Sequence, residues 1–482
     1  MRSRARATNR DDEKMIYKGF SVPRDEESSI AEIYHKFDSG VEISFPEDVI
    51  KIIYRFLERV EDLKEEFRKT YKAKEIPEIW GRAIRTCKEI CKDNLTALSV
   101  TTGFPEEALE VYLEAIFSDI NEEVFRKIAE SELDIEYIDG FKKSKIGYSK
   151  AYGPKYVIQI LPGVPGPQLL SSFQSSIVKA PSIYKPPSEE PLFTNFWIES
   201  LKAEEPSLEK YLWVIPWRGG DEDIENELFS DEDSALIVYG DENTIKDIKS
   251  RAKGKVIGYP RRFGFEVIDT RKEGLSSIAQ KIAKDVAYFD QLACFSPHVI
   301  YAIGTREKVK ELSKELSKSL ETIKLPRAKL NVDTKSVLSM LKATLMGERC
   351  IGLPVDIYCG KEHLVIFEED PEFQPSCLYR VVRVKPLDCI EKLPEYLKGY
   401  KGYFQTVGTN LDDKEKLADL LYPLGVSRIT ETGKMVPSYI LHHDGNQQIL
   451  PLLRWVDIET DSVAISDVKK KKARFSRAKI NV

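Results

Sequence analysis

The stretch "SALIVYGDENTIKDIKS", Ser234 to Ser250, determines the fold class that we expect for the chain. It begins with an apolar run of strand character, passes through Gly240, and continues with the apolar spacing of a helix. A glycine at such a junction lets the backbone approach a ligand closely, and a helix N-terminus favours phosphate. The stretch therefore predicts a strand–turn–helix unit of the nucleotide-binding type. An ordinary turn capped by Asp241 is the alternative.

The same alternation extends in both directions from this unit. Strand-like runs precede it as "YVIQIL", "SIYK" and "LWVIPW", and follow it as "GFEVID", "HVIYAIG", "HLVIFEE" and "LYRVVRVK". Helical segments separate most of them, which indicates βαβ units and mostly parallel sheets. We expect two α/β blocks that meet near residues 258–266, preceded by a mainly helical region up to about residue 135.

Composition excludes several classes of protein. The 482 residues suffice for two or three domains, and 73 basic against 79 acidic residues give a net charge of −6, which argues against a general nucleic-acid binder. We expect the basic ends, residues 1–10 and 468–482, to be solvated tails. No run approaches the roughly eighteen apolar residues of a membrane span. The seven cysteines lack disulfide-framework and zinc spacing, so we expect a cytoplasmic protein without a metal site.

One cysteine stands out by its position. In "YFDQLACFSPHVIYAIG", Tyr288 to Gly304, Cys294 lies between an amphipathic helical segment and a strand-like run. A thiol at that junction can face a cleft, and a thiolate is a good nucleophile. His298 could assist if the turn stays helical. The alternatives are a buried core thiol and a loop histidine.

Three further stretches could carry a site, each with a structural alternative. "LPGVPGPQLLSSFQSS" can present backbone amides or serve as a rigid connector. "SIYKPPSEEPL" places Lys185 at the carboxyl edge of a sheet, where ligands bind α/β folds, or leaves it in solvent. "YILHHDGNQQILPLLRWVDIE" joins two histidines to Asp444 and Gly445. There Asp444 could orient an imidazole, or the turn could dock the C-terminal segment.

Together these stretches resemble the LuxC-type long-chain acyl-CoA reductases, the fatty acid reductases of bacterial luminescence, which belong to the aldehyde dehydrogenase superfamily. The resemblance spans about residues 150–460 and rests on "PGVPG", "KPPSEEPL", "YFDQLACFSPH" and "SRITETGKMVP" with "HHDG". It implies a Rossmann-type cofactor domain joined to an α/β catalytic domain. The implied organisation is an N-terminal arm (1–45), a cofactor-binding domain (46–265), a catalytic domain (266–426) and a C-terminal segment that returns to the cleft (427–482).

The resemblance also assigns roles to residues. Cys294 would be the nucleophile that carries the acyl group as a thioester, and Lys185 would hydrogen-bond the adenosine ribose of the cofactor. The adenine side would lie beside Gly240, Asn243 and Thr244. The loop Gly163, Val164 and Pro165 would lie near the oxyanion. Because the superfamily's oxyanion-binding Asn aligns with Gly163, we expect a substitute donor, with His298 and His443 as candidates.

Two departures from the superfamily refine the expected chemistry. The Glu that activates water in hydrolytic aldehyde dehydrogenases has no carboxylate counterpart in "GYPRRFGFEVI", where Glu266 comes too late. Without that base, an acyl-enzyme persists for thiol exchange or hydride attack. The acid three residues after the lysine is replaced by Ser188, which relieves repulsion with a 2′-phosphate, so we expect NADPH as cofactor.

The predicted function is NADPH-dependent reduction of a long-chain fatty acyl-CoA, or another acyl-carrier thioester, to the aldehyde. A hydrolytic aldehyde dehydrogenase and an inactive scaffold for an acyl-transferring partner are the alternatives. An acyl-protein synthetase as partner and a homo-oligomeric state are further expectations from the resemblance.

Overall fold

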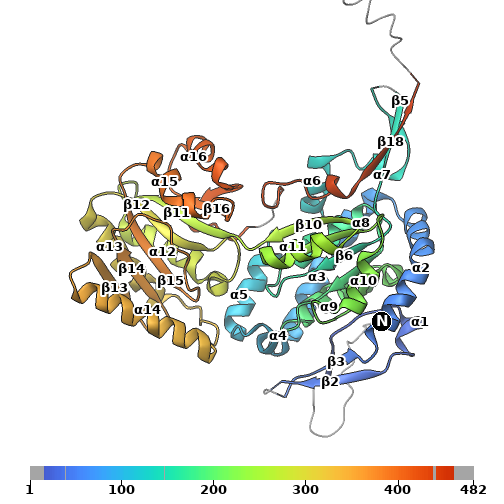
Figure 1. The fold of residues 1–482 in the computed structure, drawn as a ribbon, viewed down its shortest axis with the longest axis horizontal. Coiled ribbons are helices and arrows are strands. Elements are labelled where there is room, and N and C mark those ends of the chain that lie inside the picture. Colours follow the sequence, from blue (N-terminus) through green and yellow to red (C-terminus); the bar gives the residue numbers. More distant parts are fainter. Residues whose placement is uncertain (1–15, 38–39, 146, 438–440, 461–482) are drawn as a thin grey trace, which may run out of the picture.

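The structure, a computed structural model, describes residues 16–37, 40–145, 147–437 and 441–460. The basic ends of the chain and part of the "YILHHDG" stretch, Tyr439 and Ile440, lie outside the described residues. Two lobes lie side by side, and the C-terminal segment crosses from the lobe that carries α12–α16 to the lobe that carries β6–β10 (Figure 1).

The first lobe is built on a five-stranded parallel sheet in the order β10-β9-β6-β7-β8. The strands are β6 (Val157–Ile160), β7 (Ser182–Lys185), β8 (Leu212–Val214), β9 (Ala235–Gly240) and β10 (Lys255–Pro260). The connecting helices are α8 (Pro167–Ile177), α9 (Leu192–Glu204), α10 (Glu222–Phe229) and α11 (Glu242–Arg251). The alternation of strands and helices in the sequence therefore predicted this sheet correctly.

A helical layer covers this sheet, and a small sheet extends it. The helices are α2 (Val49–Thr70), α3 (Ile76–Asp93), α4 (Leu95–Thr102), α5 (Glu106–Phe117), α6 (Glu122–Glu132) and α7 (Glu136–Asp139). Before them come β1 (Ile16–Lys18), the short α1 (Arg24–Glu27), β2 (Glu32–Lys36) and β3 (Glu42–Pro46), whose sheet has the order β1-β3-β2. The expectation of a mainly helical start is confirmed by α2 to α7, and it missed only these strands, which are too short for a clear alternating pattern.

The second lobe carries a seven-stranded sheet in the order β13-β14-β15-β12-β11-β16-β17, in which only β13 is antiparallel. Its strands are β11 (Phe263–Asp269), β12 (Pro297–Ile303), β13 (Val355–Cys359), β14 (Leu364–Glu368), β15 (Val381–Leu387), β16 (Phe404–Thr409) and β17 (Arg428–Glu431). Its helices are α12 (Leu275–Ala287), α13 (Arg306–Thr322), α14 (Val332–Cys350), α15 (Leu393–Leu397) and α16 (Lys414–Leu421). Strand β12 lies at the centre of this sheet.

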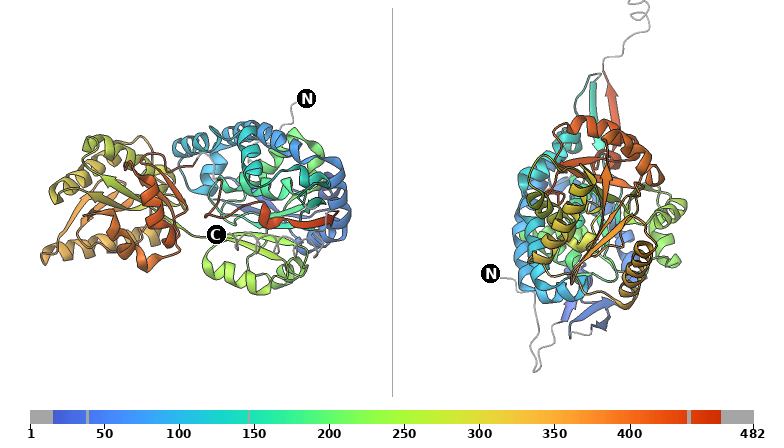
Figure 2. Two further views of the ribbon diagram at one scale, coloured as in Figure 1. Left: turned by 90° about the horizontal axis from the view of Figure 1, so that it is seen from above. Right: turned by 90° about the vertical axis from the view of Figure 1, so that its left-hand side faces the viewer.

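An arm projects from the first lobe, as Figure 1 and the right view of Figure 2 show. It consists of β4 (Lys142–Lys143), β5 (Gly147–Tyr152) and β18 (Arg454–Glu459), an antiparallel sheet in which β5 pairs with β18 from the C-terminal segment. Every residue of β18 is exposed, including Trp455, Val456 and Ile458.

The connection between the lobes is short. β10 ends at Pro260 in the five-stranded sheet and β11 begins at Phe263 in the seven-stranded sheet, so only residues 261–262 separate them. In the second lobe, β12 begins at Pro297, three residues after Cys294.

Candidate active site

Cys294 lies in a turn between the 3₁₀ helix η3 (Tyr288–Gln291) and β12, and its side chain is half-buried. The turn is closed by a hydrogen bond from Ser296 N to Ala293 O of 3.0 Å. β11 approaches it so closely that a Cβ at Gly264 would lie 2.3 Å from the carbonyl oxygen of Phe295. Only glycine allows this approach without a shift of the backbone, so "RRFGF" fixes the position of the turn.

The residues before the turn adopt an unusual conformation. Phe289, Asp290 and Gln291 have φ angles of 54°, 48° and 64°, in the left-handed region that residues with a Cβ rarely occupy. Gln291 Nε2 donates a 2.7 Å hydrogen bond to Pro297 O. The Phe289 ring stacks on Tyr112 of α5 with centroids 4.4 Å apart. Both lobes therefore hold the peptide that presents the thiol.

Three polar side chains lie around the thiol. Burial, followed by the negative charge of Asp444, raises the pKa of Cys294 to about 11, and Gln405 and Arg428 act in the opposite direction. The thiol is thus neutral at neutral pH in this state, and a group that stabilises the thiolate has a large effect on its reactivity. Gln405 was not expected at this place from the sequence, whereas Asp444 and Arg428 belong to the segment 427–482 that was expected to return to the cleft.

Gln405 and Asp444 form one hydrogen-bonded unit beside the thiol. Gln405 Nε2 donates to Asp444 Oδ1 at 2.7 Å, and Arg262 Nε donates to Asp444 Oδ2 at 3.4 Å. Both carboxylate oxygens are therefore engaged. Asp444 has a φ of 52° and is followed by Gly445 with a φ of 76°, which confirms the sharp turn expected at this glycine.

The His298 ring is hydrogen-bonded to Ser376, whereas the sequence suggested that it could assist Cys294. The turn does not continue as a helix, because β12 begins at Pro297. The Nδ1 atom of His298 accepts a 3.0 Å hydrogen bond from Ser376 N, and its ring lies 4.9 Å from that of Phe263. Burial lowers the pKa of His298 to about 3, so the ring is neutral. Its catalytic role stays a prediction that no contact among the described residues supports.

His443 packs against the first lobe. Its ring stacks on Tyr259 of β10 at 4.2 Å and 14°, and Tyr259 in turn stacks on Tyr239 of β9. Burial lowers the pKa of His443, and its Nε2 lies 3.9 Å from Asp444 Oδ1, beyond hydrogen-bonding distance. The C-terminal segment thus docks on the carboxyl ends of β9 and β10, and Asp444 binds Gln405 instead of orienting an imidazole.

The glycine-proline loop after β6 is held by a single side chain. Gln168 accepts a hydrogen bond from Gly166 N at 2.9 Å and donates to Pro162 O at 3.0 Å and Val164 O at 3.4 Å. Gly163 is exposed and lies beside Pro187, Val164 is half-buried, and Pro165 is buried. The loop therefore lies next to the segment that follows Lys185.

Lys185 is a buried cation at the carboxyl end of β7. Only 9% of the residue is exposed, its Nζ lies 5.5 Å from the centre of the Trp217 ring, and burial lowers its pKa. It forms no salt bridge with any residue in the described parts of the chain. The negative charge of Glu225 acts against burial and raises the pKa of Lys185, but the Glu225 carboxylate is itself paired with Arg251. Ser188 is exposed three residues further on.

The strand–glycine–helix unit that predicted the fold has the expected elements, and its helix is also capped. The Asp241 side chain accepts a 2.8 Å hydrogen bond from Thr244 N, which is the alternative that the sequence left open. The side chains of Asn243 and Thr244 are exposed beside Gly240. Because they are exposed, Asn243 and Thr244 are free to lie beside an adenine, as predicted.

The carboxylate of Glu266 does not face the thiol. Glu266 is fully buried in β11, and burial followed by the negative charge of Asp285 raises its pKa well above the usual range. Asp285 of α12 accepts hydrogen bonds from the backbone N–H groups of Gly433 and Met435. Asp285 therefore holds the segment that follows β17 against α12.

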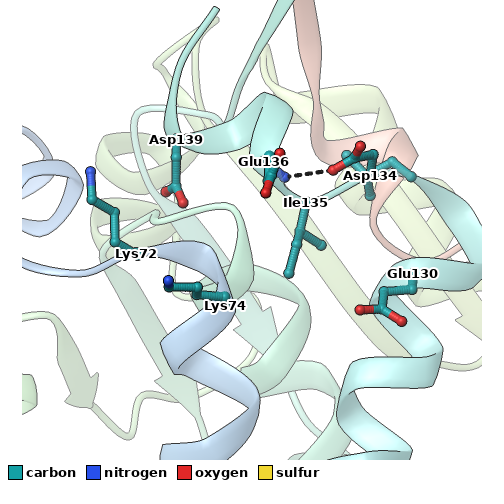
Figure 3. A pocket seen from close by; sticks show the side chains of 8 residues that line it. Lys72, Lys74, Glu130, Asp134, Ile135, Glu136 and Asp139 are labelled. Atoms are coloured by element: carbon teal, nitrogen blue, oxygen red, sulfur yellow. Dashed lines mark hydrogen bonds between the residues drawn. The ribbon is translucent and has the colours of Figure 1, made fainter. Parts of the chain in front are cut away.

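A separate surface pocket, whose lining does not include Cys294, lies on the first lobe. Figure 3 shows its side chains. Its lining mixes lysines with acidic side chains: Lys72, Lys74, Glu130, Leu133, Asp134, Ile135, Glu136 and Asp139. Within the described ranges, no cluster of three potential metal ligands occurs and no helix is long and apolar enough to cross a membrane.

The two lobes, the interlobe cysteine and the projecting arm define the aldehyde dehydrogenase fold. Aldehyde dehydrogenase C from Pseudomonas syringae, solved with NAD⁺ and octanal, has a TM-score of 0.71 at 11% identity over 95% of this chain and 99% of that one. The NADP-dependent glyceraldehyde-3-phosphate dehydrogenase from Bacillus halodurans has a TM-score of 0.67 at 11% identity over 88% and 95%.

The chain belongs to the LuxC family of acyl-CoA reductases, because the family model "Acyl-CoA reductase (LuxC)" matches residues 50–455. The chain is 27% identical over 345 residues to a long-chain acyl-protein thioester reductase of Photorhabdus laumondii, which covers 70% of each chain. It is 24% identical over 298 residues to the enzyme of that name from Vibrio harveyi, which covers 59% of this chain and 60% of the relative. The resemblance seen in the sequence is confirmed, and the protein is an oxidoreductase of the acyl-reductase class.

Proposed function

We propose that the protein reduces a long-chain fatty acyl thioester, acyl-CoA or an acyl-protein, to the aldehyde with NADPH through an S-acyl intermediate on Cys294. The proposal rests on the groups that surround Cys294. A half-buried thiol lies at the junction of the lobes beside an amide, and the nearby carboxylate, Asp444, has both oxygens bound by Gln405 and Arg262. Such a site favours acyl transfer to sulfur over activation of water.

The first half-reaction is a thioester exchange. The Cys294 sulfur attacks the carbonyl carbon of the acyl thioester, and the carbonyl electron pair moves to the oxygen. When that pair re-forms the C=O bond, the carbon–sulfur bond to the leaving thiol breaks. The proton lost by Cys294 ends on the departing thiol, so charge and atoms balance. The acyl group then remains on Cys294, in a turn held by both lobes.

In the second half-reaction the thioester carbon is reduced and the C–S bond breaks, which releases aldehyde and returns the thiol. When bound, NADPH supplies the hydride chemistry for this reduction. Lys185, Gly240, Asn243 and Thr244 would hold it at the carboxyl edge of the five-stranded sheet. The buried Lys185, without a salt bridge to any described residue, fits a phosphate, and Ser188 brings no repelling charge near a 2′-phosphate.

Two expectations about assembly belong to the same proposal. The relatives named acyl-protein thioester reductases suggest that an acylated protein, such as an acyl-protein synthetase, can deliver the substrate. The exposed β18 presents Trp455, Val456 and Ile458 on the projecting arm, which is consistent with a homo-oligomer.

The proposal is tested by trapping the acyl-enzyme. Wild-type protein incubated with radioactive palmitoyl-CoA should gain one acyl group by intact mass, and NADPH should remove it with release of aldehyde. Cys294→Ser should show no thioester label that hydroxylamine cleaves. Labelling of Cys294→Ala at the wild-type level would sink the assignment. Formation of free acid from aldehyde and NADP⁺ without CoA would favour the hydrolytic alternative, and absence of both cofactor binding and labelling would favour the scaffold.

A further inference from the structure

We propose that the side-chain amide of Gln405 is the oxyanion donor of this reaction centre, held in place by Asp444. The proposal rests on the proposed acyl transfer to Cys294 and names the residue that stabilises its tetrahedral intermediate. It concerns a buried glutamine in β16, about 110 residues after the cysteine in sequence. That strand lies two places from β12 in the seven-stranded sheet.

The orientation of the Gln405 side chain is fixed at both ends. Its Oε1 accepts a hydrogen bond from Thr406 Oγ1 at 3.3 Å, and its Nε2 donates to Asp444 Oδ1 at 2.7 Å. The residue is 2% exposed, and its backbone carbonyl accepts from Ser427 N at 3.0 Å. A flipped amide would place the carbonyl oxygen against the carboxylate, so the NH₂ group is the end that faces Asp444.

An amide nitrogen carries two hydrogens, and Asp444 takes one of them. The second hydrogen is left for Cys294. The register of β11 with β16 pairs Phe263 with Phe404, which brings Gln405 close to Gly264 and to the turn that Gly264 contacts, and the Gln405 amide lowers the pKa of the thiol. When this sulfur attacks the carbonyl carbon of a thioester, negative charge develops on the carbonyl oxygen. A neutral donor already oriented beside the sulfur therefore meets that charge without reorganising.

Asp444 acts through Gln405 and is thus a positioning residue. Its backbone is in the left-handed region, and Arg262 holds its second oxygen. Backbone of this kind persists only where the surrounding structure determines it. The carboxylate also polarises the Gln405 amide, since a charged acceptor strengthens the hydrogen bond it receives.

The other candidate side chains pack against other groups. His298 accepts a hydrogen bond from Ser376 N and lies against the Phe263 ring, and His443 stacks on Tyr259. Arg428 donates from both terminal nitrogens to the carbonyl oxygens of Met435 and Lys434. Among the described side chains that interact with the thiol, a further neutral donor is the Tyr239 hydroxyl, which also interacts with Ser171. Tyr239 is therefore the rival that the experiment has to exclude.

The test compares two reactions of the same thiol, of which only one forms an oxyanion. Acyl transfer from palmitoyl-CoA passes through a tetrahedral oxyanion, whereas alkylation by iodoacetamide does not. Gln405→Met keeps the length of the side chain and removes both N–H donors. Its acyl-enzyme formation, followed by intact mass in single turnovers, should slow by about 10²–10³-fold. Alkylation of Cys294 should slow far less, because only thiolate stabilisation is lost.

Three variants make the outcome decisive. Gln405→Asn, which retains an amide, should recover part of the acyl-transfer rate, and Tyr239→Phe should stay near wild type in both reactions. Asp444→Asn should slow acyl transfer while it speeds alkylation, since it removes a negative charge from the thiol and leaves the amide unoriented. NADPH affinity, measured by fluorescence, should be unchanged in all of them, which reports intact folding.

The inference is overturned if Gln405→Met slows both reactions equally or neither, or if the selective loss appears in Tyr239→Phe instead. Wild-type protein that alkylates but never acylates would overturn the proposed function itself. Wild-type protein that acylates at the same rate as Gln405→Met would overturn only the role of Gln405. The two failures are therefore distinguishable.

Discussion

Asp290 and Arg380 form a fully buried ion pair that joins two left-handed turns. Arg380 Nε donates to Asp290 Oδ1 at 2.6 Å, and the two side chains are 1% and 0% exposed. Asp290 is the central residue of the left-handed stretch before Cys294, and Arg380 ends a second such stretch, Leu378–Tyr379–Arg380. Left-handed backbone costs about 1–2 kcal/mol per residue that carries a Cβ. The pair thus holds together two segments that are each unfavourable alone.

Arg380→Met should destabilise the protein strongly. A buried carboxylate that loses its partner costs about 3–5 kcal/mol, because its charge is no longer compensated. The double variant Arg380→Met with Asp290→Asn should recover part of this loss, since it removes the uncompensated charge. Thermal and urea unfolding measure both effects. Lys392→Met, which breaks the exposed pair with Asp388, should leave stability near wild type. Equal stability of Arg380→Met and Lys392→Met would contradict the role of the buried pair.

The pH dependence of Cys294 alkylation should reflect its neighbours. Because burial and the Asp444 charge raise the pKa of the thiol to about 11, the wild-type rate should still be rising at pH 10. Asp444→Asn removes a negative charge, so the pKa falls and the rate at pH 8 should rise about three- to tenfold, which corresponds to half to one pK unit.

Peptide mapping after iodoacetamide treatment separates Cys294 from the exposed Cys350 and Cys359. Asp457→Asn on the exposed arm serves as the control, and its Cys294 rate should equal that of wild type. A wild-type plateau below pH 9 would show that the thiol is more acidic than its buried surroundings require.

Sequence periodicity predicted the long helices and strands. It did not predict contacts between residues that lie far apart in the sequence. The strand–glycine–helix unit at Gly240 and the turn at Cys294 follow from local pattern, since apolar spacing and Gly or Pro determine both. The strands before residue 47 were missed because each has only three to five residues.

The candidate site was predictable only where one residue type implies the chemistry. A cysteine between two elements indicates a nucleophile, whereas Gln405 inside "YFQTVGT" looks like any polar residue in a strand. Its role depends on Asp444, which arrives from a segment 39 positions later. His298 illustrates the reverse case: its chemistry is versatile, but the strand register points it at Ser376.

The Glu266–Asp285 pair should make the protein less stable at alkaline pH. Burial raises the pKa of Glu266 well above normal and that of Asp285 to about 7. Both pKa values are higher in the folded state than in the unfolded state, so the folded form binds more protons. The stability that they contribute is complete below about pH 4 and is lost as the pH rises through 7 and above.

Each proton involved changes the free energy of unfolding by about 1.4 kcal/mol per pH unit. Glu266→Gln removes one titrating group while it keeps the shape of the side chain. The loss of urea resistance between pH 6 and pH 9 should therefore be smaller in Glu266→Gln than in wild type. The exposed carboxylate variant Glu395→Gln should follow wild type. Parallel curves for all three proteins would show that the buried pair does not titrate in this range.

Cofactor preference should depend on the charge at position 188. Ser188→Asp places a carboxylate three residues after Lys185, on the exposed turn that follows β7. A carboxylate there repels a 2′-phosphate and accepts hydrogen bonds from ribose hydroxyls. The ratio of kcat/KM for NADPH to that for NADH should fall by about tenfold or more, which corresponds to a differential interaction of about 1.4 kcal/mol.

Lys185→Met provides the complementary change, because it removes the buried cation that would pair with the phosphate. It should weaken NADPH more than NADH, whereas Ser188→Asp should weaken NADPH and strengthen NADH. Ser277→Asp, an exposed serine in the first turn of α12, is the matched control and should leave the ratio unchanged. Steady-state rates of acyl-CoA reduction with each nucleotide measure all four proteins. A wild type that prefers NADH, or a ratio unaffected by Ser188→Asp, would place the 2′-phosphate away from this lysine and reject the assignment.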